Sequence, residues 1–78
     1  MINVKNKKLI KAVGNRIREF RSEKGLSQEE LANEADIPLS QIGRIERGET
    51  NPTISTLYVI CEALQIELKL LLDFKTGK

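Results

Sequence analysis

The fold of this chain is decided by residues 27–47, which read SQEELANEADIPLSQIGRIER. Ser27 begins the stretch as a helix N-cap, and Glu30 follows three residues later, which is the spacing of a capping box. Glutamates in the first turn also suit the positive end of a helix dipole. The spacing therefore predicts a short helix over about 28–34.

A second helix is predicted after a tight turn. Asp36 tolerates a positive φ better than most residues do, so it is suited to end the first helix. Pro38 keeps the residue before it out of the helical region and supplies a preset φ for a helix start. Gly48 is suited to close that helix. These signals predict a helix over about 39–47.

Two short helices joined by a tight turn form a helix-turn-helix arrangement, which makes specific physical demands. The first helix must carry a small side chain where the two helices cross, and Ala32 meets this requirement. Apolar anchors must hold both helices to a core, and these are Leu31, Ala35, Ile37, Ile42 and Ile45. The outward face of the second helix must carry groups that reach base edges. We expect these groups to be Leu39, Ser40, Gln41, Gly43 and Arg44.

Two further amphipathic helices flank this pair. In the first, apolar residues recur at steps of three and four until Gly25 stops the pattern. Its inward stripe is Leu9, Val13, Ile17 and Phe20. Thr53 caps the other helix, whose apolar face is Ile54, Leu57, Ile60, Cys61 and Leu64. The spacing of Cys61 among these residues predicts a buried core thiol.

The last element, residues 66–74, is ambiguous from its pattern. The leucines suit a short helix, whereas the alternation of apolar residues suits a strand equally well, and we favour the helix. The segment is more apolar than a small monomer needs to cover its own core, so we interpret the surplus as a dimer surface. The residues of this predicted surface are Leu68, Leu70, Leu71, Leu72 and Phe74.

The chain of 78 residues is long enough for one domain only. The predicted fold class is all-α, a compact bundle of about five short helices whose last element is a helix or a strand. We expect a basic N-terminal arm over 1–8, a domain over 9–74 and a tail over 75–78. The helix-turn-helix lies within the domain at about 28–47.

The composition excludes several classes of protein. The chain has no histidine and a single cysteine, which argues against an internal disulfide, a zinc site and most triad enzymes. No nucleophile–base pair, phosphate-cradling glycine loop or metal-ligand cluster is recognisable. We therefore expect no catalytic residues, no cofactor and no metal. No apolar stretch is long enough for a signal peptide or a membrane span, so we expect a cytoplasmic protein without membrane contact.

Charge is distributed unevenly along the chain, although the net charge is only +2. Residues 1–24 contain eight lysines and arginines against two glutamates, whereas residues 25–78 contain five basic and nine acidic residues. A basic first third on a nearly neutral small domain suits a polyanionic partner.

The chain resembles the XRE family of small helix-turn-helix proteins, the phage repressor and Cro type, over about Val13 to Leu72. The shared motifs are GNRIR at 14–18, GLSQEELA at 25–32, IGRIERG at 42–48, NP at 51–52 and TL at 56–57. Together these motifs are highly specific. The resemblance implies a compact five-helix bundle that binds a double-stranded operator, usually as a homodimer.

The resemblance also implies roles by position. Leu39, Ser40 and Arg44 fall where the family reads bases in the major groove, and Arg44 is able to pair bidentately with guanine. Gln28 stands where the family's glutamine bonds a phosphate. Further phosphate contacts are expected from Ser27, Arg47, Asn51, Arg16, Lys24 and the arm Lys5 to Lys8.

Two positions depart from the family's usual pattern. Asp36 stands where glycine is commonest, which should lower stability a little without changing the fold. Gly43 stands in the predicted recognition helix, where it costs roughly 1 kcal/mol relative to alanine. It also removes one base contact, so direct readout rests heavily on Arg44.

Three functions compete at this point. The leading hypothesis is a homodimeric repressor that inserts helix 39–47 into the major groove of its operator. The second is the antitoxin of a toxin–antitoxin pair, which represses its own operon and binds a toxin through the apolar tail; an anti-repressor is a related protein partner. The third is a protein-interaction module without DNA binding, and the presence of Gln28, Arg44 and Arg47 argues against it.

Overall fold

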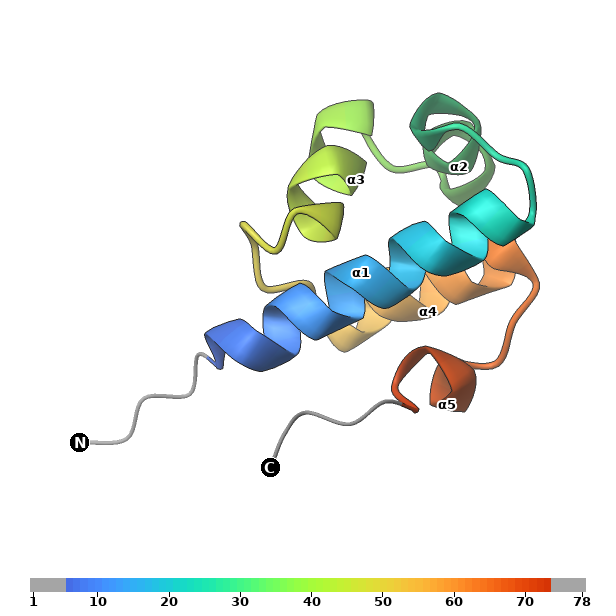
Figure 1. Ribbon diagram of the computed structural model, residues 1–78. Coiled ribbons are helices and arrows are strands. Elements are labelled where there is room, and N and C mark those ends of the chain that lie inside the picture. Colours follow the sequence, from blue (N-terminus) through green and yellow to red (C-terminus); the bar gives the residue numbers. More distant parts are fainter. Residues whose placement is uncertain (1–5, 74–78) are drawn as a thin grey trace.

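Residues 6–73 are described by the computed structural model, and they form five helices (Figure 1). The helices are α1 (Lys7–Glu23), α2 (Gln28–Ala35), α3 (Leu39–Glu46), α4 (Ile54–Leu64) and α5 (Leu68–Leu71). No strand occurs in this part of the chain, and none of its helices meets the length and hydropathy that a membrane span requires. The all-α prediction is confirmed, and the predicted bounds of α2 and α3 agree with the observed ones to within one residue.

The capping residues act as the sequence predicts. The Ser27 Oγ accepts a hydrogen bond from the Glu30 backbone N–H at 3.0 Å, and the Glu30 carboxylate accepts one from the Ser27 N–H at 2.8 Å. Asp36 ends α2 in the left-handed conformation, with φ 58°. Its backbone reverses the chain direction, so α3 can begin three residues later and pack against α2.

Helix α1 begins earlier than the apolar periodicity predicts. Asn6 caps it, because its side-chain oxygen accepts a hydrogen bond from the Leu9 N–H at 3.0 Å. Lys7 and Lys8, which we expected in the basic arm, are therefore the first residues of α1. Leu9 is also 39% exposed, and the buried residue of this turn is Ile10. The other residues of the expected arm, 1–5, lie outside the described part of the chain.

The helices pack around one hydrophobic core. In Figure 1, α2 and α3 lie on one side of α1 and α5 lies on the other, and α2 packs against both α3 and α4. The core residues are Val13, Ile17, Leu31, Ala32, Ile42, Ile45, Leu57, Ile60, Cys61, Leu64 and Leu71. Each fully buried leucine or isoleucine contributes about 1.5–3 kcal/mol relative to exposure. The core fixes the angle at which α3 projects from the bundle.

Two glycines bring α1 unusually close to α3 and to the loop after it. A Cβ at Gly14 would clash with the Ile45 backbone oxygen and lie 2.8 Å from that of Glu46. A Cβ at Gly48, which has φ +74°, would lie 3.0 Å from the Lys11 Cα. The end of α3 and the start of the next loop are therefore held directly against the α1 backbone.

The tail adopts the helical alternative. Leu71 is fully buried in the core and Leu68 is half-buried against it, since residues three apart share a helix face. The assignment of Leu71 to a dimer surface is therefore wrong. Leu70 and Leu72 are about two-fifths exposed, as that surface requires. Phe74 lies outside the described residues.

Candidate nucleic-acid interface

The outer face of α3 carries most of the residues expected to read bases. Leu39, Ser40 and Arg44 are exposed, and Gln41 is half-buried. Ser40 and Arg44 stand four residues apart, so they share one face of the helix. Within residues 6–73, the Arg44 side chain has no ion-pair partner. This face presents a polar hydroxyl and an unpaired guanidinium about one turn apart.

Gly43 does not belong to this outer face, contrary to our expectation. It is buried, because the Arg47 guanidinium one turn later lies over it. A Cβ added at Gly43 would lie 3.0 Å from an Arg47 terminal nitrogen. The glycine therefore provides the space in which Arg47 folds back along α3.

Arg47 is held in this position by Glu49. The Arg47 Nε donates to one Glu49 carboxylate oxygen at 2.8 Å, and Nη2 donates to the other at 3.1 Å. This hydrogen bonding raises the pKa of Arg47 above its ordinary value, and it lowers the pKa of Glu49. Both side chains are about half exposed. The fork that Arg47 presents to the carboxylate is the same one with which arginine binds a phosphate.

A buried ionic cluster, which we did not predict from the sequence, joins α1, α2 and α3. The Glu46 side chain is fully buried and accepts hydrogen bonds from Arg21 at 2.7 and 3.0 Å and from the Gln28 amide at 2.9 Å. Arg21 also donates to the Leu26 carbonyl at 2.9 Å, and its pKa is raised, chiefly by its bonding to Glu46. The Arg18 Nε lies 3.7 Å from Glu46. The cluster fixes the end of α3 relative to the start of α2.

The sequence carries a signal for this cluster. Glu46 stands four residues after Ile42 and next to Ile45, and Arg21 stands four residues after Ile17. Both charged residues therefore continue inward apolar stripes, where an acid and a base of opposite charge are expected to pair. The periodicity of a single helix does not reveal the pair, because its two members belong to different helices.

The expected phosphate contacts fall into two groups. Lys24 is exposed at the end of α1, and Gln28 retains a second amide N–H beside its bond to Glu46. The Ser27 hydroxyl, which accepts a bond from Glu30, retains its own proton to donate. These three residues surround the start of α2. Arg47 and exposed Asn51 lie instead directly after α3 and in the loop that follows it.

Arg16 does not join either group, contrary to our expectation. Its guanidinium donates to the Leu70 carbonyl at 2.8 Å, pairs with Glu19 and lies 4.7 Å from the centre of the Phe20 ring. Arg16 therefore holds α5 against α1, on the side of α1 that faces away from α3 (Figure 1).

The described residues contain no group of three or more potential metal ligands. Cys61 is buried in the core as predicted, and burial raises the pKa of its thiol.

Comparison with known proteins supports the same interpretation. The family model described as Helix-turn-helix (HTH_3) matches residues 17–71, which include α2, α3 and α4. This chain belongs to the helix-turn-helix family. The resemblance to the XRE type is thereby confirmed.

Members of this family with assigned roles include regulators and controller proteins. The chain is 41% identical to the HTH-type transcriptional regulator SinR of Bacillus subtilis over 64 residues, which cover 81% of this chain and 58% of SinR. It thus spans somewhat more than half of that relative's length. The crystal structure of the restriction-modification controller protein C.AhdI from Aeromonas hydrophila matches with a TM-score of 0.78 and 39% identity, over 80% of this chain and 94% of C.AhdI. The controller protein C.Esp1396I, crystallised as a tetramer with its operator, matches with a TM-score of 0.77 and 33% identity, over 81% of this chain and 83% of that one.

Proposed function

We propose that this chain is a sequence-specific DNA-binding transcriptional regulator that inserts α3 into the major groove of an operator. The observation that carries the proposal is the outer face of α3, where Ser40 and Arg44 project from a helix fixed by the Arg21–Glu46 pair. A rigid support matters because base readout depends on placing donors to within a fraction of an ångström. SinR and C.AhdI, named as a regulator and a controller, support this assignment.

Each exposed residue of α3 has a distinct capacity for base recognition. Arg44 is able to donate two hydrogen bonds to the O6 and N7 of guanine, which is the commonest specific contact. Ser40 donates or accepts and so discriminates weakly, and Leu39 offers an apolar surface suited to a thymine methyl group. Gln41, half-buried, is suited to adenine. Arg44 therefore provides the largest part of direct readout.

The two groups of phosphate contacts lie beside the C-terminal end of α3, one at the start of α2 and one in the loop after α3. Backbone contacts of this kind fix the register of a helix in the groove. Lys24, Ser27 and Gln28 bind the backbone on the side of α2, where the helix dipole also favours an anion. Arg47 and Asn51 bind it beyond the end of α3, after Arg47 exchanges Glu49 for a phosphate.

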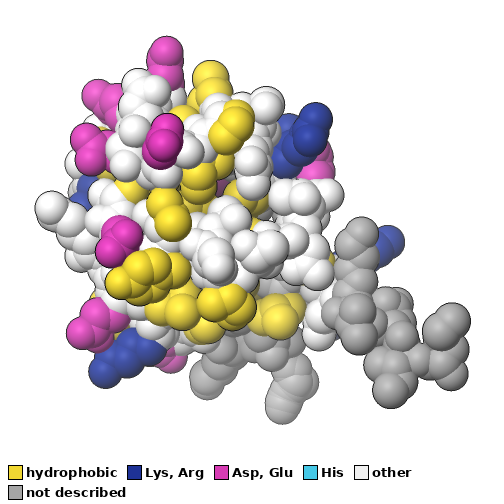
Figure 2. Space-filling model, turned by 180° about the vertical axis from the view of Figure 1, so that it is seen from behind, with side chains coloured by type: hydrophobic (Ala, Val, Ile, Leu, Met, Phe, Trp, Pro, Cys, Tyr) yellow, Lys and Arg dark blue, Asp and Glu magenta, His cyan; other side chains and the backbone are white. Residues whose placement is uncertain are grey.

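We propose that the regulator works as a homodimer. Four exposed hydrophobic side chains, Ile54 and Tyr58 of α4 with Leu70 and Leu72 from the α5 end of the chain, are available for the contact. Figure 2 shows hydrophobic side chains spread across the back of the molecule with acidic ones at one edge. A symmetric pair would place two α3 helices roughly 34 Å apart, one turn of DNA. C.Esp1396I, which assembles on its operator as a tetramer, supports self-association.

A salt-titrated binding assay tests the proposal. It compares DNA from upstream of the protein's own gene with a random duplex of equal length. We expect a preference for the upstream DNA that persists near about 0.15 M salt, with two chains per site. Equal binding that disappears with salt would show phosphate attraction alone, and it would favour a protein partner, such as a toxin, at the apolar face of α4 and α5.

A further inference from the structure

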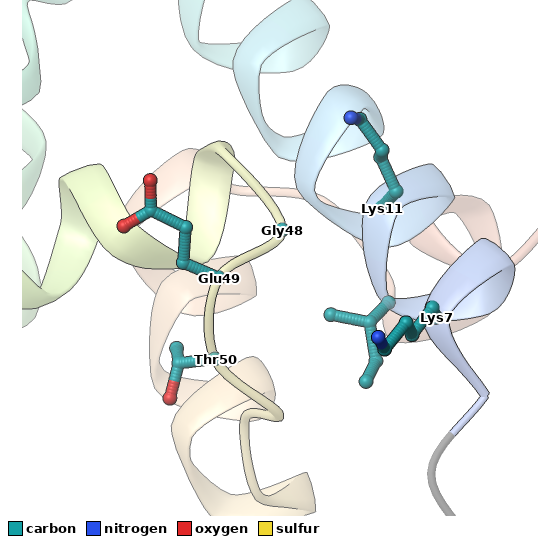
Figure 3. Close-up of a pocket in the computed structure, with 6 residues that line it drawn as sticks. Lys7, Lys11, Gly48, Glu49 and Thr50 are labelled. Carbon is teal, nitrogen blue, oxygen red and sulfur yellow. The ribbon is translucent and has the colours of Figure 1, made fainter.

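A cleft separates the start of α1 from the loop between α3 and α4. Its volume is about 320 Å³, and it is lined by Lys7, Ile10, Lys11, Gly48, Glu49 and Thr50 (Figure 3). Three of these residues come from α1, and three follow the end of α3 in one run of the loop. The loop residues that line the cleft lie between Arg47 and Asn51, the two phosphate contacts proposed at this end of α3.

The walls of the cleft are held together by close packing. The missing side chain of Gly48 lets the loop approach the Lys11 Cα, since a Cβ there would lie only 3.0 Å away. Ile10 is buried at the base of the cleft. Lys11 is thus placed beside the loop by the fold itself, and its position does not depend on the basic arm.

The cleft carries positive charge that the described residues do not neutralise. Lys7 and Lys11 are exposed, stand four residues apart on one face of α1 and have no ion-pair partner within residues 6–73. Glu49 is the one acid among the lining residues, and in the protein without DNA its carboxylate is turned toward Arg47, which donates to both its oxygens. In Figure 3 its carboxylate points away from the two lysines, which extend from α1 on the side of the loop.

We propose that this cleft binds one phosphate group of the DNA backbone through Lys7 and Lys11. The inference rests on the proposed function, to which it adds a phosphate site between the start of α1 and the first residues of the α3–α4 loop. Lysines in such a site act as mobile point charges, so the contact adds affinity on every sequence and discriminates between none. The site extends the line of contacts that begins with Arg47 and Asn51.

Charge-neutral variants test the site through the salt dependence of binding. Lys7→Gln and Lys11→Gln are made singly and together, and Lys69→Gln on α5 is the matched control, since it removes one exposed lysine from the opposite side of α1 (Figure 1). The double variant is expected to bind operator and random duplex several-fold more weakly. It should also reduce the slope of log K against log salt by about 0.9 per bound chain, the value for one phosphate, and so by about 1.8 for an operator that holds two chains. The control is expected to retain the wild-type slope.

Three results would overturn the proposal. The first is a double variant whose slope equals that of the control. The second is a double variant whose slope falls by about twice the expected amount, which would mean that the two lysines of one chain bind two separate phosphates. The third is a set of amide NMR signals, from Lys11 and Thr50, that shift with inorganic phosphate and do not shift with a short duplex, which would mean a site for free anions.

The failure of this site is distinguishable from the failure of the proposed function. A wild-type protein that binds no duplex at all would overturn both. Sequence preference that depends on Arg44, together with a double variant that matches Lys69→Gln, would overturn this site alone.

Discussion

Arg21 and Glu46 are 25 residues apart in the sequence, and two hydrogen bonds of 2.7 and 3.0 Å join them in the folded protein. The Glu46 carboxylate is fully buried, and the Gln28 amide completes its bonding. One acid thus links the α1 helix, the first residue of α2 and the last residue of α3. The orientation of the proposed recognition helix depends on this pair.

Removal of the arginine is expected to destabilise the fold strongly. Arg21→Met leaves the buried Glu46 carboxylate without its main partner, and an uncompensated buried charge costs about 3–5 kcal/mol. The measurement is urea-induced unfolding followed by circular dichroism. The double variant Arg21→Met/Glu46→Leu should regain much of the loss, because it removes the stranded charge. If Arg21→Met lowered the free energy of unfolding by less than about 1 kcal/mol, Arg18 and Gln28 would suffice to compensate the charge of Glu46.

Two glycine substitutions are expected to differ because of what surrounds them. Gly14→Ala places a Cβ against backbone oxygens of Ile45 and Glu46, which cannot rotate away as a side chain can. We expect Gly14→Ala to lower the free energy of unfolding by about 3 kcal/mol, which is the upper end of the usual cost of overpacking a core. Gly25→Ala meets open space and carries only the strain of φ +73°, about 1–2 kcal/mol. Thermal unfolding of the two variants, measured side by side, shows which substitution destabilises the protein more. A larger destabilisation by Gly25→Ala would contradict the close packing of α1 on α3.

The helices could be predicted from the sequence where their ends are set by neighbouring residues. The capping box at Ser27, the left-handed turn at Asp36 and the end of α3 before Gly48 all depend on residues within one turn of each other. The choice between a helix and a strand over residues 66–74 could not be made from the local sequence, because it depends on the burial of Leu71 against the other helices.

The site was predictable only in part for the same reason. Exposure of Leu39, Ser40 and Arg44 follows from helix periodicity. The covering of Gly43 by Arg47 and the bonding of Arg16 to the Leu70 carbonyl depend on rotamers and on contacts across 54 residues, which periodicity does not specify. The cleft beside Lys11 also exists only because α1 packs on the loop.

Arg44 is expected to determine recognition of one base pair. Arg44→Ala should weaken binding to the operator by about 1–3 kcal/mol and relax preference at that position, because a bidentate contact to guanine is lost. Binding to random DNA should change much less. A panel of operators with single base-pair changes, assayed at one salt concentration, measures both effects. An equal loss on all sequences would show that Arg44 contacts only phosphate.

The exposed leucines at the C-terminal end of the described chain are expected to hold the dimer together. Leu70→Ser/Leu72→Ser should shift the protein toward monomers in sedimentation experiments, because the substitutions remove apolar surface that dimer formation would withdraw from water. Leu39→Ser is the matched control, since Leu39 is similarly exposed but lies on α3. If the control dissociates and the double variant does not, the dimer surface lies elsewhere.

The pairing of Arg47 with Glu49 gives a pH signature of DNA binding. Because bonding to Arg47 lowers the pKa of Glu49, the contribution of the pair to stability is present above the ordinary pKa of glutamate and is lost as the pH falls through the lowered value. An NMR titration of Glu49 should therefore show a midpoint below the ordinary one, and Arg47→Gln should raise it, whereas Lys69→Gln should not. Addition of operator DNA should also raise the midpoint, since Arg47 then bonds a phosphate and leaves Glu49 beside an anion. A midpoint that stays low in the complex would mean that Arg47 keeps its bond to Glu49 and binds no phosphate.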